Sequence, residues 1–432
     1  MSKRHSNRVG DLESLFLRLE ELVLANSGAD EFEEIFKLVI AKLWDERSSR
    51  PPRFKTRPTE AETANAISSL LREASKAWPG VLAEAELALS HEHLEVCVQA
   101  LARHVIAKPD LQVMDGLFEF LVSRTAKGAK GQYFTPRHVI ELCIRMMRPS
   151  SDDLILDPAC GSGGFLIHAL NYVRTHERLG QEALRNFCAK NLWGFDIDAR
   201  AVRVAKALMI LAGDGGANIL RLNSLLMPSM AGLFSPNGDG ELSLTIEDIC
   251  RSRFRKHKGF DLILTNPPFA GEIRERHLLD NYTLGKRKPR IERDILFLER
   301  CVRLLKPGGR LAIVLPHNKF AANALAPVRQ WVLKSARVLA VVGLGRNTFL
   351  PHTHQKAGVL FLRRNLPNED PARDYPIFFA VSERDGKNSR GQLLFKNGVG
   401  EQKSIWENID HDLTEIVQSY QDFVRAEASV EA

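Results

Sequence analysis

The chain has 432 residues, which is enough for a large hydrophobic core and for two or more domains. Hydrophobic residues make up 44% and charged residues 26%, as in ordinary globular proteins, and no apolar run approaches the roughly 20 residues that span a bilayer. The six cysteines form no Cys-x-x-Cys pair and no apolar segment follows the charged N-terminus, so we expect a cytoplasmic protein without a disulfide framework, a secretory signal or a membrane partner.

The first part of the chain has apolar residues at helical spacing, and we predict an all-helical domain over residues 1–126. Asp30 is predicted to cap a helix over 31–43, and further helical runs cover 59–78 and 91–123. No motif in this part carries chemistry, which favours a packing role. A basic linker over 127–131 follows.

The next segment reads Gln132-Tyr133-Phe134-Thr135-Pro136-Arg137. Thr135 and Pro136 are predicted to open a helix, because proline is favoured in the first turn. A capped helix start would explain the segment. Its position just before a glycine-rich turn favours a functional interpretation.

That glycine-rich turn is Asp157-Pro158-Ala159-Cys160-Gly161-Ser162-Gly163-Gly164-Phe165. An apolar run precedes it and a helical pattern follows, so we predict a strand, a tight turn and a helix. Glycines let a ligand approach the main chain closely, and Asp157 can take a cationic or donor group. The spacing differs from the Gly-x-Gly-x-x-Gly pattern of dinucleotide sites.

Two further strands are each predicted to end in a polar side chain. The strand over 192–196 ends in Asp196, which could accept from two ribose hydroxyls or remain a solvated acid, while Asp198 is predicted to cap the next helix. The strand over 218–222 is followed by Asn223, whose amide offers a donor and an acceptor.

Another buried strand, over 260–265, ends in Asn266-Pro267-Pro268-Phe269. Consecutive prolines stiffen the chain there, so the segment presents an amide, a free carbonyl and an aromatic ring. A strand that simply ends at proline is the alternative.

Basic clusters flank this strand, over 251–258 and over 286–290 with Arg293, and each is either a solvated face or a phosphate contact.

Strands alternate with helices from 150 to 365, which predicts an α/β fold within a domain over 127–400. We expect a Rossmann-like, mostly parallel sheet with helices on both faces. His352 and His354 lack thiol or carboxylate partners in sequence, so we expect no metal. The helical stripe in 401–432 either packs on its own domain or docks a partner.

Taken together, the glycine turn and the Asn-Pro-Pro-Phe segment resemble the S-adenosylmethionine-dependent amino-methyltransferases. The order of motifs is similar to the modification (M) subunits of type I restriction-modification systems, which are DNA adenine-N6 methyltransferases. The resemblance implies a class I methyltransferase fold that binds S-adenosylmethionine. It assigns catalysis to Asn266, Pro267, Pro268 and Phe269, and cofactor contacts to Gln132, Tyr133, Phe134, Thr135, Pro136, Arg137, Asp157, Gly161, Ser162, Gly163, Gly164, Asp196 and Asn223.

One residue departs from that family, which commonly carries an acid where Asn223 stands. The resemblance also implies double-stranded DNA, a specificity (S) subunit and a restriction (R) subunit as partners, and the short tail after residue 365 fits recognition by a separate subunit. The alternatives are methylation of RNA or of a protein amide, and a non-catalytic DNA-binding scaffold with the same fold.

Overall fold

A computed structural model of the protein describes residues 19, 28, 30–48, 51–106, 134–212, 218–228, 244–253, 259–396 and 408–431. The chain divides into two compact units, Met1–Gly128 with Arg203–Ala217, and Ala129–Val202 with Asn218–Ala432. None of the described helices is both long and apolar enough to cross a membrane.

The first unit contains helices α2 (Glu31–Ser48), α3 (Glu60–Ala77) and α4 (His91–Ala102). The Asp30 carboxylate accepts the main-chain amide of Glu33 at 3.2 Å, as predicted for a cap, and Thr59 and Glu62 form a reciprocal capping box at the start of α3. The prediction of one helical run over 91–123 is wrong in part, because α4 ends at Ala102 and 103–106 are not helical. The remainder of that run lies outside the described residues.

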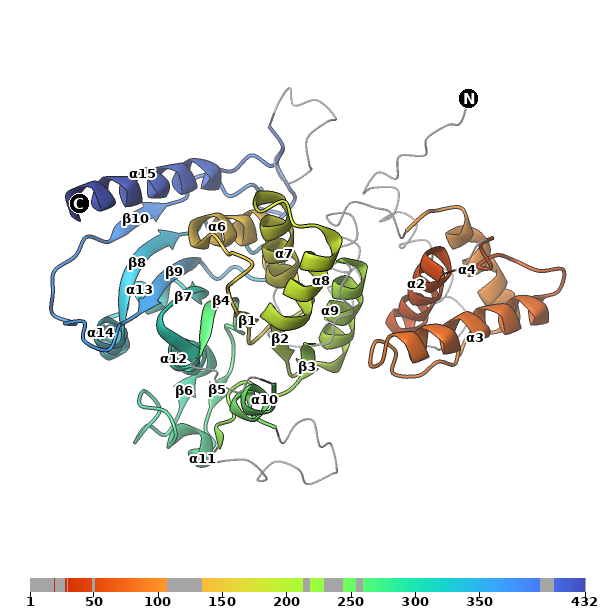
Figure 1. Ribbon diagram of the computed structural model, residues 1–432, viewed down its shortest axis with the longest axis horizontal. Helices are drawn as coiled ribbons and strands as arrows, with labels where there is room; N and C mark the ends of the chain where they lie inside the picture. The colour runs from red at the N-terminus through yellow and green to blue at the C-terminus, as the bar shows by residue number, and fades with distance from the viewer. Residues whose placement is uncertain are drawn as a thin grey trace. The chain divides into compact units, whose positions relative to one another are not determined.

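The second unit is built on an eight-stranded sheet with the order β10-β8-β9-β7-β4-β1-β2-β3 (Figure 1). All neighbouring strands pair in parallel except β9, which is antiparallel to both β7 and β8. The strands are β1 (Ile155–Asp157), β2 (Leu192–Asp196), β3 (Ile219–Arg221), β4 (Phe260–Thr265), β7 (Leu305–Pro316), β8 (Ala336–Gly343), β9 (Ala357–Arg364) and β10 (Phe378–Val381). The predicted mostly parallel α/β sheet is confirmed.

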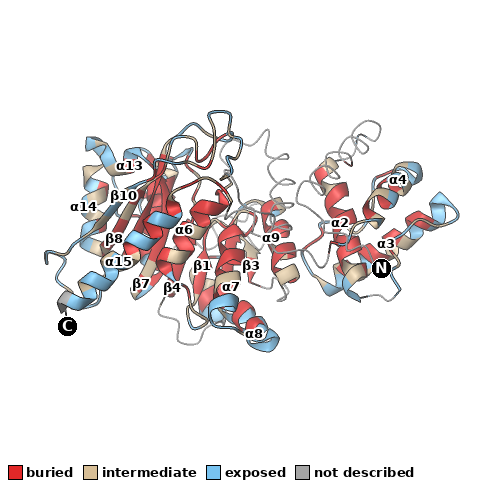
Figure 2. Cartoon of the chain, turned by 90° about the horizontal axis from the view of Figure 1, so that it is seen from above, coloured by how far each residue is buried: buried red, intermediate tan, exposed pale blue. Residues whose placement is uncertain are grey.

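Helices cover both faces of this sheet. On one face α6 contacts both α7 and α15, and on the other α12 packs on β7 and α14 on β8 (Figure 1). Figure 2 shows the central strands buried and the outer sides of the helices exposed, whereas the edge strand β10 has no buried residue. The helices of the second unit are α6 (Arg137–Met147), α7 (Gly164–His176), α8 (Gln181–Asn191), α9 (Ala199–Ala212, shared with the first unit), α10 (Ile246–Arg253), α11 (Arg276–Leu279), α12 (Arg293–Leu304), α13 (Asn318–Ala321), the 3-10 turn η4 (Asn323–Leu325), α14 (Ala326–Ser335) and α15 (Leu413–Glu431).

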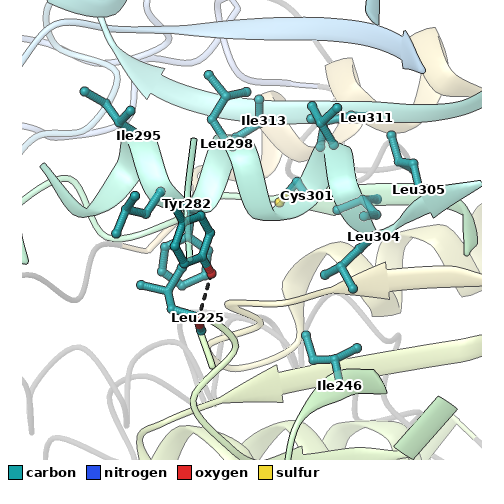
Figure 3. Close-up of a cluster of buried hydrophobic side chains, with 14 of the residues drawn as sticks. Leu225, Ile246, Tyr282, Ile295, Leu298, Cys301, Leu304, Leu305, Leu311 and Ile313 are labelled. Carbon is teal, nitrogen blue, oxygen red and sulfur yellow. Dashed lines mark hydrogen bonds between the residues drawn. The ribbon is translucent and has the colours of Figure 1, made fainter. Parts of the chain in front are cut away.

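The core on the α12 side explains why this helix forms. Ile295, Leu298 and Cys301 recur at helical spacing and are nearly fully buried. Figure 3 shows them in one cluster with Leu311 and Ile313 of β7. The apolar stripe of α12 thus fixes the connection that follows β4.

The strand order creates a switch point at β1, because the chain runs outward through β2 and β3 on one side and through β4 and β7 on the other. In open α/β sheets ligands bind beside the carboxyl ends of the strands at such a point. The loops after β1, β2, β3 and β4 leave this edge, and they carry the polar motifs singled out in the sequence.

The Lys-Pro-Gly-Gly stretch over 306–309 has the composition of a turn, but β7 already begins at Leu305 and includes this stretch.

The apolar stripe of the C-terminal helix packs on its own unit, since α15 contacts α6 and β10. Tyr420 of this helix lies edge-on to Phe378, with ring centroids 5.5 Å apart.

Candidate functional site

The glycine turn joins β1 to α7, as predicted. Gly161 and Gly163 have φ values of +51° and +87°, a left-handed backbone that glycine adopts without strain. A Cβ added at Gly161 would meet nothing within 4 Å, so open space lies beside the main chain there. Ser162 is buried between them. The turn therefore leaves room for a ligand against its backbone.

Gly164 is required for a different reason. A Cβ at this position would lie 2.8 Å from Nη1 of Arg137, so the absence of a side chain lets that guanidinium pack on the start of α7. Arg137 is buried and its guanidinium lies 4.4 Å from the ring centroid of Phe134. The packing of Arg137 against Gly164 thus joins the start of α6 to the glycine turn. Gln132 and Tyr133 lie outside the described residues.

Asp157 ends β1 and is 1% exposed. Burial raises the pKa of its carboxyl from 3.8 to about 7, although Oδ1 accepts the main-chain amide of Ala159 at 3.1 Å. The nearby carboxylate of Asp196 contributes a smaller part of this rise. A cation placed beside Asp157 would lower the pKa of its carboxyl.

Asp196 lies at the end of β2, and its two carboxylate oxygens are held by main-chain amides. Oδ2 accepts from Gly161 and Oδ1 from Asp198, each at 2.9 Å. Loss of hydration raises the pKa of Asp196, and these two amides act against that rise. Asp198 caps α9 as predicted, because its Oδ1 accepts from the amide of Ala201 at 2.8 Å. The acid expected to bind ribose is therefore oriented by the glycine turn itself.

Asn223 follows β3, and its Oδ1 accepts the main-chain amide of Leu225 at 3.1 Å. The adjacent Ser224 hydroxyl donates to the carbonyl of Pro158 at 2.6 Å, which ties this loop to the glycine turn. The loops after β1 and β3 are thereby fixed to each other.

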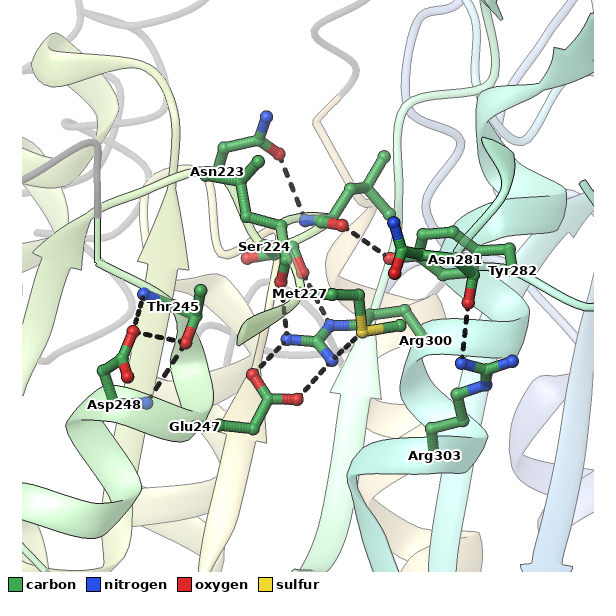
Figure 4. A network of polar contacts seen from close by, with 12 residues as sticks. Asn223, Ser224, Met227, Thr245, Glu247, Asp248, Asn281, Tyr282, Arg300 and Arg303 are labelled. Carbon is green, nitrogen blue, oxygen red and sulfur yellow. Dashed lines mark hydrogen bonds and ion pairs between the residues drawn. The ribbon is translucent and has the colours of Figure 1, made fainter. Parts of the chain in front are cut away.

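A buried arginine that the sequence analysis missed holds the same loop from the other side (Figure 4). Arg300 of α12 is 1% exposed and donates to the carbonyls of Ser224 and Leu226, at 2.8 and 3.0 Å. Its guanidinium also forms a two-point ion pair with Glu247 of α10, at 2.5 and 2.8 Å. These partners lie 53 to 76 residues away in sequence, so no local pattern could have revealed them.

Asn266 follows β4, and its side chain is held by a residue of the segment before α6. Nδ2 donates to the hydroxyl of Thr135 at 2.9 Å. Oδ1 is buried and has no hydrogen-bond partner among the described residues. Burying an unsatisfied carbonyl oxygen is costly, so this atom is a strong acceptor for a donor that enters the site.

Thr135 therefore does not cap α6. Pro136 occupies the cap position, so the helix begins one residue later than predicted, and no side chain bonds the helix start. The hydrogen bond from Asn266 to Thr135 supports a functional interpretation of this segment, whereas no hydrogen bond supports a role of Thr135 as a helix cap.

The rest of the Asn-Pro-Pro-Phe segment is mostly enclosed. Pro267 is buried, and Phe269 is 6% exposed with its ring edge-on to Phe349 at 5.6 Å between centroids. Phe349 lies in the connection between β8 and β9, which returns to this edge because β9 runs antiparallel. No motif in the sequence singled out Phe349.

Comparison with known proteins places this geometry in a family. A model of the N-6 DNA methylase family matches residues 110–419. The methylase subunit of the type I restriction enzyme StySPI from Salmonella potsdam is 28% identical over 260 residues, 59% of this chain and 45% of the relative. The EcoKI methylase subunit of Escherichia coli K12 is 26% identical over 260 residues, which again are 59% of this chain and 45% of the relative. The chain thus matches less than half the length of these relatives.

Solved structures share the fold. The methyltransferase subunit of a type I restriction-modification system from Streptococcus thermophilus has a TM-score of 0.61 at 16% identity, with 96% of this chain and 94% of that chain covered. A chain from a structure of the type I system has a TM-score of 0.60 at 19% identity, covering 97% and 82%. Together with the match of the family model over most of the sequence, the strand-end loops described above identify the chain as a member of the N-6 DNA methylase family.

Proposed function

We propose that the protein transfers a methyl group from S-adenosylmethionine to the exocyclic N6 of an adenine flipped out of duplex DNA. In this proposal it is the catalytic subunit of a type I restriction-modification system and takes target recognition from a specificity subunit, with a restriction subunit as a further partner. The observation that carries the proposal is the buried, unpartnered Oδ1 of Asn266, held at the end of β4 by Thr135.

The residues at the strand ends fit the methyl donor. Open space lies beside Gly161, and Asp196 is oriented by two amides with lone pairs left for ribose hydroxyls. Asn223 can pair with the edge of an adenine ring, and Asp157 can take a positively charged group. S-adenosylmethionine supplies an activated methyl group on a sulfonium when it is bound.

The chain's own residues then act on the nucleophile. An adenine amine is a poor nucleophile because its lone pair is delocalised into the ring. Asn266 Oδ1 and the Pro267 carbonyl accept hydrogen bonds from the two N–H groups of the adenine amine. These hydrogen bonds localise the lone pair and stabilise the positive charge that develops on nitrogen. Phe269 stacks on the flipped base, and the rigid prolines hold these groups in line. Water takes the released proton.

Methyl transfer with a tritiated donor tests the proposal. The full chain, with and without a co-purified specificity partner, is offered duplex DNA, RNA and protein. We expect label in duplex DNA, recovered as N6-methyladenine. Label in RNA or protein but not in DNA would reject the substrate, and failure to bind the donor would support the non-catalytic scaffold.

A further inference from the structure

An insertion over residues 270–292 leaves the Asn-Pro-Pro-Phe segment and returns at the start of α12. Its base is closed by the antiparallel pair β5 (Glu272–Ile273) and β6 (Ile291–Glu292), and the main-chain amide of Arg293 donates to the carbonyl of Gly271 at 3.0 Å. Both ends of the insertion are therefore fixed next to the proposed catalytic loop.

The far part of this insertion is anchored on buried groups. The Tyr282 hydroxyl donates to the carbonyl of Leu225 at 2.7 Å (Figure 3). The carboxylate of Glu299, fully buried in α12, accepts the main-chain amides of Thr283 and Leu284, each at 2.7 Å. A buried charge satisfied by two amides holds this stretch of backbone in one conformation.

Further contacts fix the chain just before the tip. Arg303 of α12 donates to the carbonyl of Asn281 at 3.0 Å (Figure 4). A Cβ at Gly285 would lie 2.8 Å from the carbonyl oxygen of Leu279, so only glycine fits there. Arg287, at the tip, has a φ of +65°, a strained backbone that persists only where the surrounding structure imposes it.

The tip itself carries three consecutive cations, Lys286, Arg287 and Lys288, which we call the basic turn. All three side chains are exposed, and within the described part of the chain none forms an ion pair with a carboxylate. The three arginines outside the basic turn, Arg274, Arg276 and Arg290, each have such a partner. The basic turn is therefore a concentration of positive charge that the protein does not neutralise.

Carboxylates of the same insertion are engaged elsewhere. Glu272 pairs with Arg274 and Arg290, Asp280 with Arg276, and Glu292 with Lys319, while Glu275 accepts the main-chain amide of Arg274. Each of these carboxylates therefore has a partner other than the three cations of the basic turn.

We propose that the basic turn binds phosphates of duplex DNA and holds the duplex beside the Asn-Pro-Pro-Phe segment. A fixed backbone presents the three charges together, and Lys and Arg on such a turn contact the sugar-phosphate backbone without reading sequence. Each phosphate that they neutralise releases counterions. This inference rests on the proposed action on DNA and adds the surface that receives the duplex.

The test is the salt dependence of binding to a labelled duplex, measured by fluorescence anisotropy with the full chain. The variant Lys286→Gln/Arg287→Gln/Lys288→Gln should bind more weakly than the wild type. Because each phosphate contact contributes about −0.9 to the slope of log Kobs against log [salt], the slope should become shallower by about 2 to 3. Binding of S-adenosylmethionine, followed by calorimetry, should be unchanged.

A matched control removes three exposed cations at the opposite edge of the sheet, as Arg174→Gln/Arg185→Gln/Lys190→Gln on α7 and α8. It lowers the net charge by the same amount and should keep the wild-type slope. A second control keeps the charges, as Lys286→Arg/Arg287→Lys/Lys288→Arg, and should bind like the wild type.

The proposal is overturned by a wild-type slope in the glutamine variant, by an equal change in the control on α7 and α8, or by a change with duplex RNA alone. If wild-type protein binds neither S-adenosylmethionine nor DNA, the proposed function fails. If it binds both and the basic turn does not alter the slope, only the assignment of this surface fails.

Discussion

The hydroxyl of Thr135 accepts a hydrogen bond from the side-chain amide of Asn266 at 2.9 Å, across 131 residues of sequence. An amide side chain presents either its oxygen or its nitrogen to a neighbour, and here the nitrogen is occupied by Thr135. The oxygen is left buried, with no partner in the described part of the chain. The segment before α6 therefore fixes which atom of the Asn266 amide is left for the proposed substrate.

Replacing Thr135 tests this relationship. Thr135→Val keeps the shape and removes the acceptor, so the Asn266 amide loses its orientation and kcat should fall by about 10-fold or more, as for loss of a hydrogen bond worth about 1.4 kcal/mol. Thr135→Ser retains the hydroxyl and should recover most of the activity. Steady-state methyl transfer measures both variants, and equal losses in valine and serine would contradict a role for the hydroxyl.

Asn266→Ala removes the proposed acceptor for the adenine amine. Removing one group that stabilises developing charge in a transition state costs about 10²- to 10³-fold in kcat, so methyl transfer should become undetectable in ordinary assays. The affinity for S-adenosylmethionine should stay near the wild-type value, as measured by calorimetry. A folded variant that loses donor binding and transfer together would refute the assigned role.

Asp196→Ala should weaken binding of S-adenosylmethionine, because it removes both the proposed ribose acceptor and the partner of the Gly161 amide. Asp198→Ala is the matched control, since it keeps the main-chain amide that bonds Asp196. Its expected cost is about 1 kcal/mol of stability from the lost cap of α9. Unchanged donor affinity in Asp196→Ala, measured by calorimetry, would count against the role.

Arg300→Met should destabilise the fold by about 3–5 kcal/mol, because the change leaves Glu247 without its partner and two loop carbonyls without a donor. Urea unfolding monitored by circular dichroism gives this difference. A double-mutant cycle with Glu247→Gln isolates the ion pair, and a coupling energy near zero would show that the loop carbonyls, rather than Glu247, are what Arg300 stabilises.

Asp157 should make stability depend on pH. Its carboxyl titrates near 3.8 when the chain is unfolded and near 7 in the fold, so the native state binds more protons between these values. The stabilisation from protonated Asp157 is complete below about pH 4 and is lost as pH rises through about 7, at up to about 1.4 kcal/mol per pH unit.

The comparison for this pH effect is Asp157→Asn, which stays neutral and still offers an oxygen to the Ala159 amide. Urea unfolding at pH 5 and pH 8 should show a smaller decline in the variant than in the wild type. Parallel declines would mean that other groups cause the pH dependence.

Local patterns were enough to place most of the candidate site. The glycine turn, the acid ending β2 and the Asn-Pro-Pro-Phe segment each follow an apolar strand, and β4 begins and ends where predicted. Parallel strands bring their carboxyl ends to one edge, which is why the loops that carry these motifs leave the sheet on the same side.

What the sequence could not provide depends on contacts between distant elements. Arg300 reads as one polar position on an amphipathic helix, and its burial against the loop after β3 follows only from how α12 packs. Thr135 reads as a helix cap because threonine often serves as one, yet its hydroxyl bonds Asn266 instead. Such partners are set by tertiary packing, which spacing along the chain does not encode.

The candidate site lies at the carboxyl ends of the strands, so the opposite edge of the sheet is available for engineering. Gly180 is exposed in the short connection between α7 and α8, on the edge away from the ends of β1, β2 and β4. Exposed connections of this kind tolerate added sequence better than packed elements do. A fluorescent reporter inserted into the chain at this glycine would leave every strand-end loop intact, and would allow the proposed assembly with a specificity subunit to be tested by energy transfer.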